Sequence, residues 1–256
     1  MEPLLTVENL SKTYGRLLAC DRISFDLYPG QVLGIIGESG SGKSTLLNCV
    51  AGQLQPDQGQ LTYRRPSGER LDLTALAEPQ RRRMTRTEWG FVQQNPRDGL
   101  RMNVTAGANI GERLMDVGQR HYGDIRTEAR RWLAQVEIDH SRIDRLPSTF
   151  SGGMQQRLQL ARVLVTHPRL VLMDEPTGGL DVSVQARLLD LLRNLVRELH
   201  LSVILVTHDI GVVRLLADRL MVMQGGQVVE TGLTDQVLDD PHHAYTQQLV
   251  SATLVP

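Results

Sequence analysis

The sequence is poor in cysteine and has no long apolar run. Its only two cysteines, Cys20 and Cys49, form neither a close pair nor the spacing of a metal site. Disulfides are therefore not expected, which suits a reducing compartment. No apolar run approaches the roughly 18 to 20 residues that a membrane-spanning helix needs, and the start, MEPLLTVENL, lacks the basic and apolar regions of a signal peptide. We expect a cytoplasmic protein that reaches a membrane only through a partner.

An excess of positive charge is also missing. Lys and Arg number 28 against 29 Asp and Glu, a formal net charge of -1. Binding to nucleic acid through phosphate neutralisation is therefore not expected. The densest basic run, RRRMTR from Arg81 to Arg86, is interpreted as a solvated helix face, and a docking patch for an acidic partner is the alternative.

The sequence does contain alternating strand and helix signals. Its 256 residues are 41% hydrophobic, enough for one large α/β domain or two small ones. Short strands are predicted at 5–9, 23–27 and 31–37, the last apolar throughout and hence buried. Helical periodicity dominates from Asn103 to about Val165. Strands return at 169–174, 201–207, 219–223 and 227–232, the last two joined as a hairpin across Gly225 and Gly226.

A phosphate-binding loop is predicted between the third strand and a helix. The segment GESGSGKST fits G-x-x-x-x-G-K-[ST] in full. Glycines let the backbone curl so that N–H groups point at phosphate, Lys43 adds a cation, and the Ser44 hydroxyl can ligate magnesium. The predicted nucleotide contacts are Gly37, Glu38, Ser39, Gly40, Ser41, Gly42, Lys43, Ser44 and Thr45.

Two carboxylates end the buried strand at 169–174, at the strand terminus where ligands of open α/β sheets gather. Asp174 is placed to hold magnesium, and Glu175 to accept a proton from attacking water. The alternative is that both acids cap the following turn. Given the phosphate loop, we favour hydrolysis.

Three further side chains are candidates for the same site. His208 follows the strand at 201–207 and can contact a γ-phosphate and the attacking water, or it can be a capping or surface histidine. Gln94, after the strand segment WGFVQ, is a neutral amide able to touch magnesium and water. Tyr14 precedes the first hairpin turn and is either a stacking partner for a base or a packing residue.

A second anion site is predicted at FSGGMQQR, where Ser151, Gly152 and Gly153 begin a helix. Free N–H groups and the positive end of the helix dipole favour an anion there. The phosphate loop already cradles one nucleotide's phosphates. Two cradles suggest two nucleotides, or two chains.

With these motifs in this order, the sequence resembles the ATP-binding cassette (ABC) ATPases over nearly its whole length. The resemblance implies an α/β fold: a RecA-like phosphate-loop core with an N-terminal antiparallel β subdomain and an inserted α-helical subdomain. The implied bounds are 1–95 and 166–256 for the core with its β subdomain, and 96–165 for the helical subdomain. Together they form one ABC domain, 1–256.

The resemblance also implies ATP and Mg²⁺ as ligands and a head-to-tail pairing of two subunits, either homo- or heterodimeric. Ser151 and Gly153 of one chain would contact the γ-phosphate held by the other. Asp181, in PTGGLD, would link the two sites, and Glu175 with His208 would perform hydrolysis. Met154 stands where many members carry glutamine, a change not expected to abolish activity.

Two branches of the family are in question. The segments FSGGMQQR, GGLDVSVQA and PHHAYTQQL resemble peptide-importer ATPases, whereas RTEWGFVQQNPRDGLRMNVTAGANIGERLM and RHYGDIR resemble the ATP-binding subunit of bacterial carbon-phosphorus lyase systems. The second resemblance implies a soluble lyase core as partner, docked near 96–115, rather than a membrane permease.

The expected function is ATP hydrolysis that drives the phosphonate-degrading complex. The alternatives are an import ATPase for a peptide-like or phosphonate solute, and a binding module that closes on ATP but hydrolyses it slowly. Glu175 and His208 argue against the slow module. A phosphoryl-transferring kinase would have no use for the SGG segment.

Overall fold

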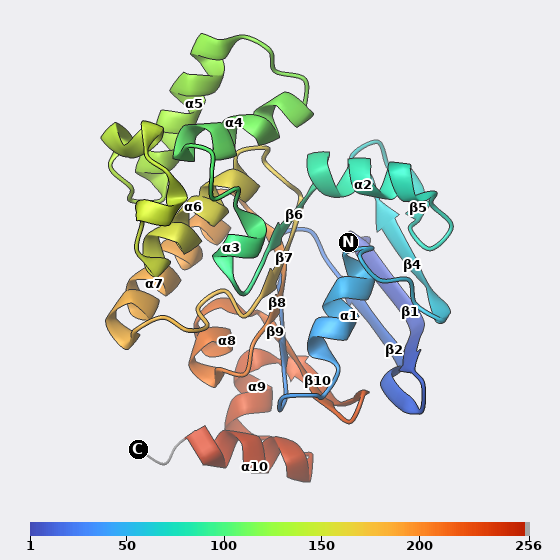
Figure 1. Ribbon diagram of the computed structural model, residues 1–256. Helices are drawn as coiled ribbons and strands as arrows, with labels where there is room; N and C mark the ends of the chain where they lie inside the picture. The colour runs from blue at the N-terminus through green and yellow to red at the C-terminus, as the bar shows by residue number, and fades with distance from the viewer. Residues whose placement is uncertain (254–256) are drawn as a thin grey trace. The chain divides into compact units, whose positions relative to one another are not determined.

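The computed structural model describes residues 1–253, and at positions 82 and 253 the backbone only. The last three residues of the predicted domain, 254–256, lie outside the described part. The chain forms two compact units, Met1–Arg82 with His200–Pro256, and Arg83–Leu199. The segment predicted to form a helical subdomain falls inside the second unit (Figure 1). In the part of the chain that is described, no helix is both long and apolar enough to span a membrane.

The first unit contains an antiparallel sheet in the order β2-β1-β4-β5. Its strands are β1 (Leu5–Tyr14), β2 (Leu17–Leu27), β4 (Gln58–Arg64) and β5 (Arg70–Asp72). Strands β1 and β2 are longer than the alternating patches at 5–9 and 23–27, because pairing continues across register shifts. Asn9 and Arg22 adopt φ angles of 50° and 48° near those shifts. Such bulges interrupt the period of two from which strands are predicted.

The same unit contains a mostly parallel group of strands in the order β10-β9-β3-β8. They are β3 (Val32–Ile36), β8 (Ser202–Val206), β9 (Arg219–Gln224) and β10 (Gln227–Leu233). All residues of β3 and β8 are buried, as expected for parallel strands covered on both faces. The predicted β9–β10 hairpin across Gly225 and Gly226 is confirmed.

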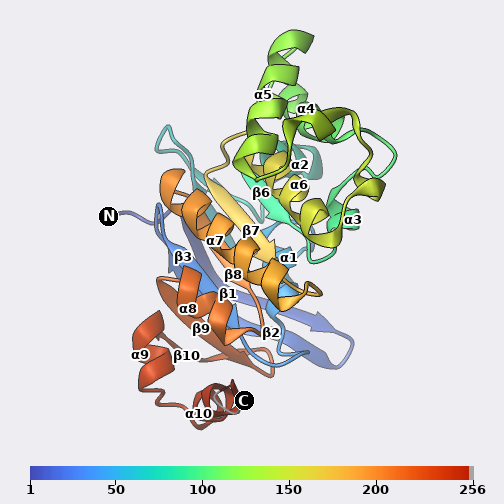
Figure 2. The same ribbon diagram turned by 90° about the vertical axis from the view of Figure 1, so that its left-hand side faces the viewer.

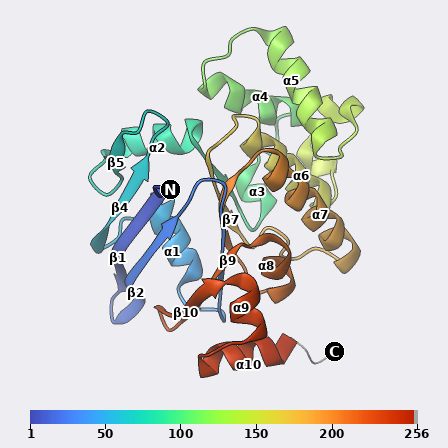
Figure 3. The ribbon, with the colours of Figure 1, turned by 180° about the vertical axis from the view of Figure 1, so that it is seen from behind.

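Helices complete the first unit. They are α1 (Lys43–Val50), α8 (Ile210–Leu216), α9 (Thr234–Asp239) and α10 (Ala244–Thr253). Figure 3 shows α10 beside α9 at the C-terminal end. The cysteines are buried in this unit. Burial raises the pKa of Cys20 to about 12 and of Cys49 to about 11, so both thiols stay protonated at neutral pH.

The second unit combines two parallel strands with a cluster of helices (Figure 2). Helix α2 (Glu78–Thr87), which carries the basic run, crosses from the first unit into the second. The remaining elements are β6 (Trp89–Val92), α3 (Pro96–Gly99), α4 (Ala106–Asp116), α5 (Tyr122–Gln135), η1 (His140–Asp144), η2 (Pro147–Thr149), α6 (Gly152–Leu164), β7 (Leu170–Asp174) and α7 (Val182–Glu198). The helical texture predicted for 103–165 is confirmed.

Apolar residues at helical spacing explain why these helices pack. In α5, Ala129, Trp132 and Leu133 are buried, and Trp132 is fully inaccessible. Helices α4 and α6 contact each other and both contact α5. The interior of this cluster therefore fixes α6, whose first turn carries the SGG segment.

Candidate functional site

The phosphate loop connects β3 to α1, in the predicted order of strand, loop and helix. A Cβ at Gly37 would collide with the carbonyl oxygen of Met223, and one at Gly42 with that of Ala19. Gly42 also has a φ of 101°, a conformation that other residues rarely adopt. Glycine is therefore required at both positions by close backbone packing.

The Lys43 side chain folds back over the start of the phosphate loop. Its Nζ donates to the carbonyl oxygens of Gly37 and Glu38, each at 2.8 Å, and the side chain is almost fully buried. The N-cap of α1 is Gly42, which has no side chain to cap the helix. This end of α1 thus places a cation beside the N-terminus of a helix, the chemistry that recognises phosphate.

His208 follows the carboxyl end of β8, at the same end of the sheet from which the phosphate loop begins. Strands β3 and β8 are parallel, and Ile35 pairs with Val206. The residues two positions further on, Gly37 and His208, therefore leave adjacent strands at the same level. His208 is exposed, and Asp209 is the cap of α8, accepting from Gly211 N at 2.8 Å. The capping alternative for His208 is excluded, and its contact with a γ-phosphate stays a prediction.

Tyr14 is the last residue of β1, before the tight turn at Gly15, as predicted. Its side chain is 50% exposed, and Lys12 Nζ lies 5.9 Å from the ring centroid. An exposed ring at a hairpin end is available for stacking. Contact with a base remains a prediction.

Tyr245 is a contact of the phosphate loop that the sequence did not reveal. Its hydroxyl oxygen accepts a hydrogen bond of 2.8 Å from Glu38 N. The start of α10 is anchored in turn, because the N–H groups of His242 and His243 donate to Glu230 at 2.8 and 3.0 Å. Burial opposes ionisation of Glu230, but these hydrogen bonds hold its pKa below the usual value. In the sequence, the segment PHHAYT indicated only a resemblance to one branch of the family, and it did not predict this contact.

Replacing Tyr245 by phenylalanine is expected to weaken ATP binding about fivefold, the equivalent of one ordinary hydrogen bond. The reason is that Glu38 N loses the acceptor that fixes the peptide at the start of the loop. Titration with a fluorescent ATP analogue measures the effect. Tyr122→Phe, an exposed tyrosine of α5 in the other unit, is the control. An unchanged Kd in Tyr245→Phe would refute a role in the loop.

In the second unit, Gln94 and Glu175 come together. Strands β6 and β7 are parallel and Val92 pairs with Met173, so Gln94 and Glu175 follow adjacent strands at one level. A Cβ at Gly178 would lie 3.6 Å from the amide nitrogen of Gln94 and 3.5 Å from Cβ of Glu175. Asp174 and Glu175 are both partly exposed. Three of the predicted site residues, Gln94, Asp174 and Glu175, thus lie at the carboxyl ends of two neighbouring parallel strands.

Glu175 is not a helix cap. Its φ is 43°, in the left-handed region, and its carbonyl oxygen accepts a hydrogen bond from Gly178 N at 2.9 Å. The N-cap of the following helix α7 is Asp181, whose exposed side chain makes no capping bond. A non-glycine residue held in this conformation is often part of a functional site. Neither acid is therefore the N-cap of α7, and the role of Glu175 in hydrolysis stays a prediction.

Ser151 caps the helix that carries the SGG segment. It is exposed, and its Oγ accepts from Met154 N at 3.4 Å at the start of α6. Gly152 is exposed as well, whereas Gly153 is buried and a Cβ there would collide with Val184 of α7. Gly153 is thus required by the close packing of α6 against α7, whereas the backbone at Gly152 is accessible from outside.

The donor atoms at these positions suit magnesium. Ser44 offers a hydroxyl, Asp174 a carboxylate and Gln94 an amide oxygen, all hard oxygen ligands of the kind Mg²⁺ prefers. Among residues 1–253, no group of three or more His, Cys, Asp or Glu side chains is arranged to hold a metal ion.

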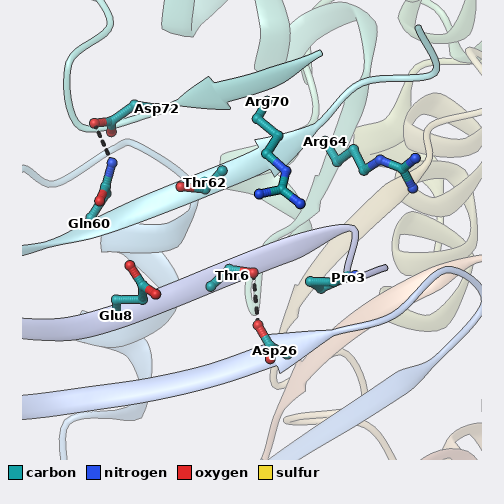
Figure 4. A pocket seen from close by; sticks show the side chains of 9 residues that line it. All are labelled: Pro3, Thr6, Glu8, Asp26, Gln60, Thr62, Arg64, Arg70 and Asp72. Atoms are coloured by element: carbon teal, nitrogen blue, oxygen red, sulfur yellow. Dashed lines mark hydrogen bonds between the residues drawn. The ribbon is translucent and has the colours of Figure 1, made fainter. Parts of the chain in front are cut away.

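A separate groove of about 500 Å³ lies on the antiparallel sheet of the first unit. Figure 4 shows Arg64 and Arg70 toward one end, and Glu8 and Asp72 toward the other. Its polar groups also pair with one another, for example Gln60 Nε2 with Asp72 at 2.9 Å. The groove contains none of the residues predicted to bind nucleotide.

Comparison with known proteins decides the family. The family described as "ABC transporter" matches residues 20–178. The chain belongs to this family. It is 65% identical over 253 residues to the phosphonates utilization ATP-binding protein PhnK of Escherichia coli strain K12, covering 99% of this chain and 98% of that one. It is 36% identical to the dipeptide transport ATP-binding protein DppD of Bacillus subtilis strain 168, covering 98% of this chain and 77% of DppD.

Solved ABC structures share the fold. The dimeric ATP-binding cassette MJ0796, in a post-hydrolysis state with ADP and Pi, matches with a TM-score of 0.79 at 29% identity, covering 90% of this chain and 98% of that one. CbiO1 of Clostridium perfringens matches with a TM-score of 0.81 at 27% identity, covering 99% of this chain and 96% of that one. The chain is an ABC ATPase that binds ATP, and the fold inferred from its motifs is confirmed.

Proposed function

We propose that this ABC ATPase acts with the carbon-phosphorus lyase core in phosphonate breakdown. The observation that carries the proposal is the 65% identity to PhnK over nearly the whole of both chains, against 36% to DppD. The cofactor is ATP with Mg²⁺, and the enzyme is cytoplasmic, reaching a membrane only through a partner.

The proposed docking surface is the segment from Pro96 to Met115, which contains DGLRMN. Support comes from how firmly its turn is held. The buried Asn109 accepts from Arg101 N at 2.8 Å and donates to the carbonyl oxygens of Arg101, Val104 and Thr105 at 3.0 to 3.2 Å. A preformed turn loses little conformational entropy when a partner binds.

The working form that we propose is a head-to-tail pair with two ATP molecules between subunits, each bound by the phosphate loop of one chain and the SGG segment of the other. The dimeric state of the related MJ0796 supports this proposal. So does the prediction of two separate anion sites in one chain, at the N-termini of α1 and α6.

In the proposed reaction, Lys43 and the loop amides hold the phosphates while Glu175 takes a proton from the attacking water. His208 and Gln94 orient that water and the γ-phosphate, and Ser151 of the opposite chain stabilises the transferred charge. Mg²⁺, held by Ser44, Asp174 and Gln94, would neutralise charge on the phosphate oxygens. Asp181 would connect the two sites. The domain bounds 1–95 with 166–256, and 96–165, are kept as part of this proposal.

The test uses a Glu175→Gln variant, in which slowed hydrolysis traps the ATP-bound dimer. The tagged variant is purified with MgATP from cells grown on a phosphonate, and the attached subunits are identified. Recovery of lyase subunits together with loss of growth on phosphonate in a deletion strain is the expected result. Recovery of a membrane permease without lyase subunits would favour an importer and overturn the lyase assignment.

A growth control separates the two machines. An importer mutant should fail to accumulate phosphonate, whereas a lyase mutant should take it up and leave its carbon-phosphorus bond intact. Uptake of labelled phosphonate by the deletion strain is therefore expected to be normal. Lost uptake would contradict the lyase role while leaving the ATPase assignment untouched.

A further inference from the structure

A buried glutamine of α6 holds the residue that precedes Gln94. Gln159 is fully buried. Its Oε1 accepts from Gln93 N at 2.8 Å, and its Nε2 donates to Gln93 O at 3.1 Å. Both ends of one side-chain amide thus bind the two polar backbone groups of a single residue. This pairing fixes the peptide planes on either side of Gln93, and hence the direction in which the chain enters Gln94.

A second glutamine and a glycine complete the arrangement. Gln156, one turn earlier on α6 and also buried, donates from its Nε2 to Gln93 O at 3.4 Å, and its Oε1 accepts from Gln159 Nε2 at 3.3 Å. On the other side, a Cβ at Gly99 would collide with the amide of Gln159. Gly99 ends α3, inside the segment proposed to dock the partner. The amide of Gln159 is therefore confined on several sides.

We propose that Gln159 is a positioning residue for ATP hydrolysis, acting through the backbone of Gln93 on Gln94. This inference rests on the role proposed for Gln94. Gln94 and Glu175 both lie close to Gly178, so a rotation of the peptide at Gln93 would move the Gln94 amide relative to the proposed base. Because Gln159 is on the helix that begins after Ser151, the same contact ties the glutamine segment to the SGG segment.

Gln155 shows what a purely structural glutamine does on the same helix. It is buried, and its Nε2 donates to Pro147 O and Phe150 O, both at 3.0 Å. Those bonds hold η2 against α6 and do not involve Gln93 or Gln94. Gln155→Met is therefore a matched control for the loss of a buried amide.

The experiment is a double-mutant cycle on the purified full chain, with steady-state release of phosphate from MgATP as the readout. Methionine at 159 keeps the unbranched shape and loses the amide. Gln159→Met is expected to lower kcat about fivefold to tenfold with an unchanged KM for ATP. In a Gln94→Ala background, the same substitution is expected to have no further effect, because the two residues act in series.

A second variant protects the test if Gln159→Met folds poorly. Gly99→Ala leaves both glutamines in the sequence but drives a methyl group into the amide of Gln159. It should lower kcat by a similar factor and also lose its effect in Gln94→Ala. Gln155→Met, by contrast, should combine additively with Gln94→Ala whatever its own effect, because it does not act through Gln94.

The outcomes separate the inference from its premise. If Gln94→Ala itself leaves kcat unchanged, the role of Gln94 fails and this inference fails with it. If Gln94→Ala slows hydrolysis but Gln159→Met and Gly99→Ala reduce kcat by the same factor in both backgrounds, Gln159 is structural only. A folded Gln159→Met variant with wild-type kcat would overturn the proposal as well.

Discussion

Replacing Glu175 by glutamine is expected to lower kcat for ATP hydrolysis by about a hundred- to ten-thousand-fold. Glutamine has nearly the same shape as glutamate but cannot accept a proton from water. The left-handed backbone at this position, with φ of 43°, is imposed by the turn that Gly178 closes, so the amide should occupy the same place. Steady-state phosphate release measures the rate, and nucleotide titration should show ATP binding intact.

Glu198→Gln, a change of the same charge at the exposed end of α7, is the matched control and should hydrolyse at the wild-type rate. The Glu175→Gln protein should also accumulate as an ATP-dependent dimer, seen as a larger species on gel filtration. Equal hydrolysis rates for wild type and Glu175→Gln would remove Glu175 from the mechanism. The remaining candidate base would then be His208.

Replacing Ser151 by aspartate is expected to reduce hydrolysis about a hundred- to a thousandfold, the usual cost of losing a group that stabilises transferred charge. Ser151 is the N-cap of α6, and aspartate is an equally good cap, so the helix should stay intact. Its negative charge would repel the phosphates of the nucleotide bound to the opposite chain. ATP binding by a dilute, isolated subunit should be unchanged, because its own phosphate loop is intact.

Ser151→Asn separates charge from shape, because asparagine caps the helix without adding charge. Ser151→Asn should hydrolyse ATP far faster than Ser151→Asp, and the two variants should have the same melting temperature. A mixing experiment then decides between one chain and two. Ser151→Asp and Lys43→Met are each expected to be inactive, but their mixed dimer keeps one complete site, so up to about a quarter of the activity should return. No recovery on mixing would show that Ser151 serves its own chain.

Much of the site was predictable because its chemistry is local in sequence. The phosphate loop from Gly37 to Thr45 is one continuous segment, and its glycines, lysine and serine serve a single turn between a strand and a helix. The acid pair at 174 and 175 and the SGG segment are local in the same sense. Bulges near Asn9 and Arg22 broke the alternation, which made β1 and β2 look shorter than they are. The strands β4 and β5 were not predicted at all.

What the sequence by itself determined was the class of protein, a nucleotide-binding α/β protein of the ABC family with a phosphate loop, together with predictions of a base and of a second anion-binding helix start. Only the tertiary structure decided which distant residues contact the segments that carry these motifs. The contacts of Tyr245 with Glu38 N and of Gln159 with Gln93 join positions 207 and 66 residues apart. Such contacts leave no periodic or spacing signal, because hydrogen bonds form between groups that the fold brings together, whatever their separation along the chain.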